Sequence, residues 1–274
     1  MEIGAKFVDL SSYNENMAKG IEDKLFFLKH LEKDKEYIFV DFGCADGSLI
    51  SAMYELFNKE GCTKNKYVGY DISETMIDFA KTKFNFPTND VTFTTDWDTV
   101  EEKLVQYNGK KKVLVLSSVI HEVFSYASGI KDILDFWGRV THSDFDYVCI
   151  RDMMPSSDID RPTNIWVVTG FYENHGEMYQ LKDFEEKWGK ITNNLNFVHF
   201  LLKYRWEINW NRELNENYFP MYVDDLPKNM EGYKLDYLER FRVPFLEECW
   251  EKDFGVKIDD YTHVKAIFSK AKKL

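Results

Sequence analysis

The stretch that decides the fold is Val40-Asp41-Phe42-Gly43-Cys44-Ala45-Asp46-Gly47-Ser48, which closes a short apolar run. Gly43 can take a backbone conformation with positive φ, and without a Cβ atom it lets a ligand approach the main chain. Gly47 stands where a helix would begin and would present free backbone N–H groups. An acid that closes a strand, followed by Gly-x-x-x-Gly, is typical of a turn that binds a nucleotide cofactor. It is not a P-loop, because no Gly-Lys-Ser/Thr follows.

Short apolar runs alternate with amphipathic runs on both sides of this turn. We expect strands at 36–42, 66–71, 91–95, 113–118 and 146–151, and helices at 48–58, 74–84, 99–106 and 128–140. This alternation predicts an α/β protein whose mostly parallel sheet carries helices on both faces. Two late strands, 233–241 and 262–270, with a helix at 245–254 between them, would bring the sheet to seven strands.

The remaining segments divide the chain into three parts. A helix at 12–31 would cap one edge of the core, which spans 1–152. An insertion at 153–232 begins with a loop-rich stretch at 153–182. Two aromatic-rich helices at 182–205 and 206–217 follow it, and 218–232 is irregular, so the insertion would form a helical cap. The third part, 233–274, would complete the core sheet.

Composition narrows the classes of function. The 274 residues contain 35 Lys and Arg against 47 Asp and Glu, so the formal net charge is −12. This balance disfavours long nucleic acids, although a local basic patch would leave RNA open. No apolar run approaches the roughly 18 residues of a membrane span. The chain does not begin like a signal peptide, and its four cysteines form no Cys-x-x-Cys pair. We therefore expect a reduced cytoplasmic protein without a structural metal; the oligomeric state stays open.

The glycine turn resembles the first motif of the class I S-adenosylmethionine-dependent methyltransferases, an acid followed by Gly-x-Gly-x-Gly at the end of the first strand. Asp41, Gly43 and Gly47 match that motif, and Ala45 replaces the middle glycine. The resemblance covers 36–151 and the two late strands, and implies a Rossmann-like fold. It also implies S-adenosylmethionine as cofactor, S-adenosylhomocysteine as product, and Cys44 beside the cofactor.

A second motif supports the same cofactor. Asp71 follows the second strand, 24 positions after Gly47. A carboxylate about 20 residues after the glycine turn binds the ribose hydroxyls in βαβ cofactor folds. A carboxylate suits a diol because it accepts two charge-assisted hydrogen bonds. Ile72 and Met76 would then line the adenine pocket.

The ends of the third and fourth strands carry weaker matches. In the family, an acid at the position of Asp96 accepts from the adenine amino group, and its neighbour, here Trp97, belongs to the adenine wall. Asp96 could equally be the N-cap of the next helix. Ser117, at the end of the fourth strand, resembles the family's fourth motif, in which a Ser or Asn is followed shortly by a His.

His121 is the candidate catalytic residue. A neutral imidazole at the substrate side of the cofactor could take a proton from the acceptor, because its pKa lies near neutrality. The alternative is a histidine that only packs under the insertion. Glu122 is expected to point elsewhere, since adjacent residues do not share a face. Arg151 and Tyr13 are candidate substrate contacts, and Arg151 could instead pair with an acid.

The predicted reaction is methyl transfer to a hydroxyl or amine of a small molecule enclosed by the cap. The Asp/Asn-Pro-Pro-Tyr/Phe signature of amino-directed DNA methyltransferases is absent, and no Pro-Cys nucleophile occurs. The alternatives are an RNA- or protein-directed methyltransferase and a non-catalytic cofactor-binding module. A nicotinamide-dependent oxidoreductase fits less well, because the Gly-x-Gly-x-x-Gly spacing is missing.

Overall fold

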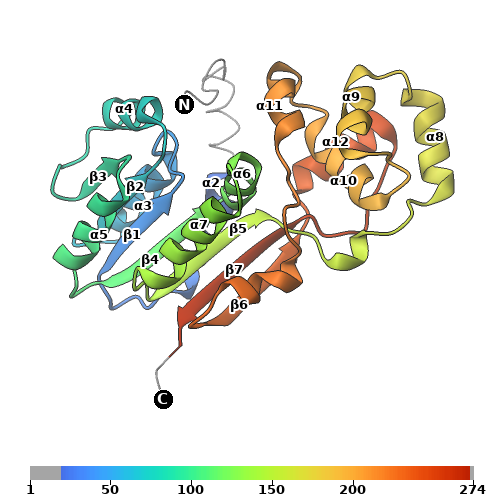
Figure 1. The fold of residues 1–274 in the computed structure, drawn as a ribbon. Helices are drawn as coiled ribbons and strands as arrows, with labels where there is room; N and C mark the ends of the chain where they lie inside the picture. Colours follow the sequence, from blue (N-terminus) through green and yellow to red (C-terminus); the bar gives the residue numbers. More distant parts are fainter. Residues whose placement is uncertain (1–19, 272–274) are drawn as a thin grey trace.

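A single seven-stranded sheet organises the protein (Figure 1). The computed structural model describes residues 20–271. The strand order is β3-β2-β1-β4-β5-β7-β6. The first five strands pair in parallel and β7 pairs antiparallel with both β5 and β6, which confirms the predicted mostly parallel sheet. The strands are β1 (Tyr37–Phe42), β2 (Lys66–Tyr70), β3 (Val91–Thr94), β4 (Lys111–Ser117), β5 (Tyr147–Met153), β6 (Tyr233–Phe241) and β7 (His263–Lys270).

Helices cover both faces of the sheet, and each face has its own apolar cluster. One cluster joins the sheet to α5 (Trp97–Gln106), α7 (Ile130–His142) and the 3-10 segment η4 (Val223–Asn229). The other joins it to α3 (Ser48–Lys59), α4 (Glu74–Lys83) and the 3-10 segment η1 (Phe26–His30). Every residue of β1 is buried, as expected for a central parallel strand.

The order of the strands places a switch point between β1 and β4. The chain runs from β1 outward through β2 and β3, then returns to place β4 on the other side of β1. Ligands of open α/β sheets bind outside the carboxyl ends of the strands at such a point. The glycine turn and the short helix α6 (Ile120–Tyr126) both begin at this edge.

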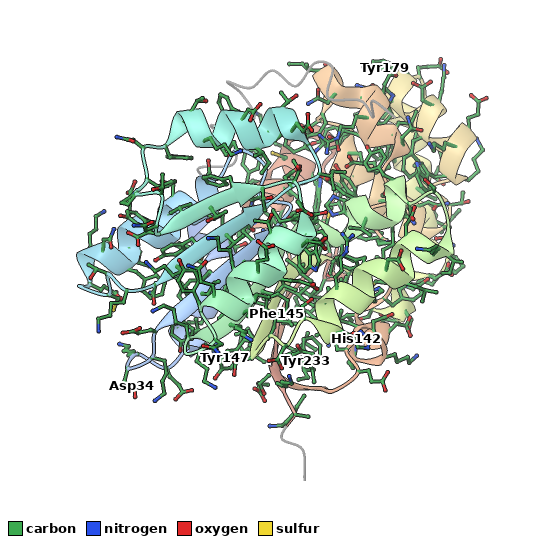
Figure 2. The ribbon with its side chains drawn as sticks, turned by 60° about the vertical axis from the view of Figure 1, so that its left-hand side comes forward. Asp34, His142, Phe145, Tyr147, Tyr179 and Tyr233 are labelled. Carbon is green, nitrogen blue, oxygen red and sulfur yellow. The ribbon has the colours of Figure 1, made fainter. Side chains whose placement is uncertain are left out.

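The cap is helical and has an apolar core of its own (Figure 1). It contains α8 (Ile165–His175), α9 (Tyr179–Trp188), α10 (Asn194–Lys203) and α11 (Trp210–Asn215). The late helix α12 (Pro244–Phe254) also packs into it, through Trp250. Figure 2 shows Tyr179 in the cap at one end of the molecule and Tyr147, Phe145 and Tyr233 at the other.

Four expectations for the helices differ from the structure. The expected helix 206–217 is the 3-10 segment η3 (Glu207–Asn209) followed by α11 (Trp210–Asn215). The stretch 153–182 is not only loop, because α8 lies within it and Asn164 caps its N-terminus. The expected helix 182–205 is two helices, divided near Gly189, whose φ is +94°. In the described part of 12–31, a single turn α2 (Ile21–Lys24) and η1 replace a continuous helix. None of the described helices is long and apolar enough to cross a membrane.

Candidate functional site

The glycine turn is held in shape by close packing. Gly43 has φ +76°, and its N–H donates to the Tyr70 carbonyl at 2.8 Å. A Cβ atom on Gly43 would lie 2.6 Å from Val119 Cγ2. Gly47 has φ +75°, and a Cβ there would lie 2.8 Å from the ring of Phe93. Both positions therefore require glycine for two reasons, the left-handed backbone and the lack of room.

Asp71 joins the turns that follow β1 and β2. Its Oδ2 accepts from the Ala45 N–H at 2.9 Å, and its Oδ1 accepts from the Ser73 N–H at 2.9 Å. Burial raises the pKa of Asp71, although these two bonds and the charge of Arg212 oppose the rise. Each carboxylate oxygen keeps a second lone pair. Asp71 can therefore hold the turn and still accept hydrogen bonds from a diol.

Apolar side chains lie next to Asp71 on the way into α4. Ile72 is 75% exposed, an unusual state for a large apolar side chain directly after a buried strand. Met76 is half-buried, and its N–H donates to Ser73 Oγ, the N-cap of α4. An adenine-binding surface at these two residues stays a prediction.

The acid and the thiol of the first motif are both buried. Burial raises the pKa of Asp41 to about 7, although the nearby charge of Lys24 opposes the rise. Burial also raises the pKa of the Cys44 thiol, so Cys44 is a packed loop residue and not a reactive thiolate. Asp46 is buried as well and pairs with Lys83 at 2.5 Å.

The residues after β3 have structural roles. Asp96 is the N-cap of α5, since its side chain accepts from the Asp98 N–H at 3.1 Å and from the Thr99 hydroxyl at 3.2 Å. Trp97 is 7% exposed and packs between Phe42 and Tyr70, with ring centroids 5.5 and 5.2 Å away. Trp97 thus belongs to the apolar core beneath the site.

Arg151 pairs with an acid of the N-terminal segment. The other candidate substrate contact, Tyr13, lies outside the described residues. The Arg151 Nε donates to Asp23 Oδ2 at 2.6 Å, and the guanidinium lies 5.4 Å from the ring centre of Phe241. Lys265 pairs with the other oxygen of Asp23 at 2.5 Å. Arg151 therefore ties the N-terminal segment to the sheet, which is the pairing with an acid that its sequence position allowed.

Asp152 organises the start of α6. Its Oδ2 accepts from the N–H groups of Val119 and Ile120, at 3.0 and 2.7 Å, and its Oδ1 lies 2.7 Å from His121 Nδ1. The nearby Ser117 hydroxyl is buried at the end of β4, with no hydrogen-bond partner among the described residues. Asp152 was not among the residues singled out from the sequence. An acid at a strand end, like Asp71, was the available signal.

His121 is enclosed by acids. It is 5% exposed, and its Nε2 lies 3.9 Å from Glu216 Oε2. Burial alone would lower the pKa of His121, but the charges of Asp152, Glu122 and Glu216 and the bond to Asp152 raise it to about 9. These acids therefore favour the protonated imidazole, and a protonated ring cannot accept a proton.

The cap supplies Arg212, which the sequence analysis did not identify. Arg212 donates to Glu122 Oε1 at 2.8 Å and to Glu216 Oε1 at 2.7 Å. The expectation that Glu122 points away from His121 is wrong, because the guanidinium draws the carboxylate of Glu122 into the same cluster. No local sequence signal could have located Arg212, since 90 positions separate it from Glu122.

Three members of this cluster have the spacing of metal ligands. Ligand atoms of His121, Glu122 and Glu216 lie within 4.8 Å of one another. Arg212 already donates to both carboxylates, so a cationic group stands beside them without a metal. His121, Glu122, Glu216 and Arg212 form an ion-pair network, and the absence of a metal stays a prediction.

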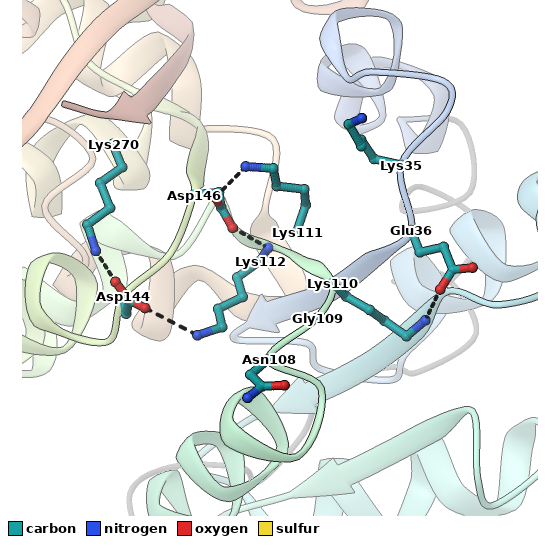
Figure 3. A pocket seen from close by; sticks show the side chains of 10 residues that line it. All are labelled: Lys35, Glu36, Asn108, Gly109, Lys110, Lys111, Lys112, Asp144, Asp146 and Lys270. Atoms are coloured by element: carbon teal, nitrogen blue, oxygen red, sulfur yellow. Dashed lines mark hydrogen bonds and ion pairs between the residues drawn. The ribbon is translucent and has the colours of Figure 1, made fainter. Parts of the chain in front are cut away.

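A separate pocket lies at the opposite edge of the sheet, with a volume of about 390 Å³ (Figure 3). Its lysines pair with acids: Lys110 with Glu36 at 2.6 Å, and Lys111 with Asp146 at 2.8 Å. It lies at the amino-terminal ends of β1, β4 and β5, away from the glycine turn. The pocket therefore plays no part in the candidate site.

Comparison with known proteins identifies the fold. No family model matches the chain, and no curated protein matches its sequence. Among solved structures, a SAM-dependent methyltransferase from Anabaena variabilis has a TM-score of 0.51 at 10% identity, over 93% of this chain and 85% of that one. A putative S-adenosylmethionine-dependent methyltransferase from Listeria monocytogenes has a TM-score of 0.47 at 14% identity, over 93% and 100%. With the strand order above, the first likeness shows that the chain has the class I S-adenosylmethionine-dependent methyltransferase fold.

Proposed function

We propose that the protein transfers the methyl group of S-adenosylmethionine to a hydroxyl or amine of a small molecule. The observation that carries the proposal is the hydrogen bond from the Ala45 N–H to the Asp71 carboxylate, which connects the turns after β1 and β2. It places a carboxylate with free lone pairs beside a glycine turn, at the sheet edge where open α/β sheets bind ligands.

Three features of the chain would hold the cofactor. The Asp71 carboxylate would accept from the ribose hydroxyls, and the glycine turn that it holds through the Ala45 N–H would lie beside the bound nucleoside. Ile72 and Met76 would cover the adenine, and burying Ile72 would remove its exposed apolar surface from water. The bound cofactor supplies an electrophilic methyl group, so the protein mainly has to orient the acceptor and exclude water.

In this proposal His121 is a positioning residue and not the general base. Asp152 and Glu216 face its two ring nitrogens, and the raised pKa keeps the ring protonated. The imidazolium would hold the cap acid Glu216 against α6. This role keeps His121 at the acceptor side, as its sequence position suggested.

A small acceptor fits the cap better than a polymer. Most cap aromatics fill the cap's own core, which gives the cap a defined shape. With a net charge of −12 and its pocket lysines paired, the protein offers a long phosphate backbone little attraction.

Calorimetric titration with S-adenosylmethionine and S-adenosylhomocysteine tests the cofactor part of the proposal. Asp71→Ala should weaken binding by about 1.5–3 kcal/mol, the scale of hydrogen bonds to a charged group. The control is Asp78→Ala, which removes an exposed carboxylate from α4 and should leave affinity unchanged. If neither nucleoside binds the wild-type protein, the proposal fails.

Methyl-labelled cofactor tests the acceptor class. The protein should label components of a small-metabolite extract and leave total RNA unlabelled. Labelled RNA without a labelled metabolite would favour the RNA-directed alternative. Cofactor binding without labelling of any fraction would favour a non-catalytic binding module.

A further inference from the structure

The apolar core of the cap helices α8 to α11 is largely separate from the two clusters of the sheet, with Met153 of β5 packing against it. The cap cluster contains Phe171 and Phe200 of the cap helices and Trp250 of α12, and none of its buried members belongs to either sheet cluster. Bodies that meet through small or polar contacts commonly move relative to one another. The position of the cap at this edge of the sheet therefore depends on the individual polar contacts that join the two.

Polar contacts join the cap to α6, and they come from one short segment, residues 212–218. Arg212 donates to Glu122 at 2.8 Å, and the Tyr126 hydroxyl donates to Glu216 at 2.9 Å. The Asn217 N–H donates to Ser125 Oγ at 2.7 Å. Within this junction, the cap residue Arg212 binds an acid of each body, Glu122 of the sheet and Glu216 of the cap, while the buried His121 on the sheet side lies 2.7 Å from Asp152 and 3.9 Å from Glu216.

The two acids that Arg212 binds differ in exposure. The Glu216 side chain is 3% exposed, whereas those of Glu122 and Arg212 are 40% and 34% exposed. The bond to Glu216 is thus a fixed part of the cap. The bond to Glu122 is the one that water can reach, and partly exposed ion pairs are weak enough to break and re-form.

This exposed pair lies next to the cofactor edge. The charge of Arg212 lowers the pKa of Asp71, and the charge of Asp71 in turn raises that of Glu122. The groups that act on Glu122 are His121, Arg212, Glu216 and Asp71. A contact here would close the cap beside the carboxylate that our proposed function places on the ribose.

We propose that the Arg212–Glu122 ion pair is a latch that closes the cap over the bound cofactor, and that its opening admits and releases the nucleoside. This inference rests on the proposed function. Closure of this kind excludes water and keeps the ligand in the site during the reaction. Opening often sets the rate of product release.

The release rate of S-adenosylhomocysteine, measured by stopped-flow tryptophan fluorescence, tests the latch. Glu122→Gln removes the charge on the sheet side and leaves Arg212 paired with the buried Glu216. Release should be about fivefold faster, which corresponds to about 1 kcal/mol. Glu102→Gln makes the same change at an exposed site on α5 and should release at the wild-type rate.

Salt supplies a second readout that a merely structural role would not move. Salt screens exposed charges, so wild-type release should accelerate between about 0.05 and 0.5 M salt and approach the rate of E122Q. The E122Q rate should change little over that range. This measurement on the wild-type protein stands even if E122Q folds poorly.

Two outcomes separate the inference from the proposed function. In the first outcome, the wild-type protein binds S-adenosylhomocysteine, but E122Q releases it at the wild-type rate or the wild-type release rate does not change with salt. This result contradicts the latch and leaves the proposed function intact. If the wild-type protein does not bind the nucleoside, the proposed function fails and the latch fails with it.

Discussion

At the scale of single residues, Gly43 is constrained more tightly than a flexible turn residue. Its φ is +76°, and the space that a Cβ would fill is occupied by Val119, at the start of α6. The glycine turn and α6 therefore touch at a point with no spare volume. This contact fixes the glycine turn against the start of α6, at the edge of the sheet where the proposed cofactor would bind.

Gly43→Ala should lower the free energy of unfolding by about 2–4 kcal/mol. The cost combines a left-handed backbone for an L-residue with an overpacked contact 2.6 Å from Val119. Urea denaturation measures it. Gly109→Ala is the control, because Gly109 is exposed and a Cβ there meets no atom within 4 Å. Equal stabilities for the two variants would contradict the packing argument.

The pH dependence of stability should reveal the buried charge on His121. Its pKa is raised from 6.5 to about 9, against the effect of burial, by Asp152, Glu122 and Glu216. The raised pKa means that the protonated form stabilises the folded protein. This contribution is complete below pH 6.5 and is lost as the pH rises through about 9.

The measurement compares His121→Gln with the wild-type protein by urea unfolding at pH 6 and pH 9. The variant should lose more stability at pH 6 than at pH 9, so its stability should depend less on pH over this range. His142→Gln, at an exposed position on α7, should keep the wild-type dependence. Parallel curves for His121→Gln and the wild-type protein would show that His121 is neutral.

At the scale of elements, the start of α5 bears on the two roles expected for Asp96, which are a contact with adenine and the N-cap of the helix. The Asp96 side chain accepts from the Asp98 N–H and the Thr99 hydroxyl at the first turn of α5. The resemblance to the family suggested a contact with adenine, whereas the observed bonds are those of an N-cap.

Asp96→Ala should lower the free energy of unfolding by about 1 kcal/mol, the usual effect of losing an N-cap. Affinity for S-adenosylmethionine, measured by calorimetry, should not change. Asp96→Ser keeps a capping oxygen and should recover most of the stability. A large loss of affinity in Asp96→Ala, not recovered by serine, would place Asp96 on the adenine instead.

At the scale of the whole molecule, the net charge and the pairing of the pocket lysines disfavour binding of a phosphate backbone. The formal net charge is −12, and the lysines of the pocket at the amino-terminal edge pair with acids (Figure 3). A polyanion would have to displace those acids and would gain little from releasing counterions.

Filter binding with a labelled RNA at physiological salt should therefore show no retention at protein concentrations up to about 1 μM, the tight end of non-specific binding. Doubling the salt should make no difference. Tight retention that falls steeply with salt would contradict this expectation and would favour an RNA-directed enzyme.

The sequence by itself determined the parallel sheet, the glycine turn and the position of Asp71, because these depend on short patterns. A buried strand shows in consecutive apolar residues, and its carboxyl end shows in the acid or glycine that follows. Only the tertiary structure decided that Trp97 belongs to the core and that Arg212 meets Glu122. Such contacts join residues tens of positions apart, and their geometry depends on how the cap packs on the sheet, which no local pattern encodes.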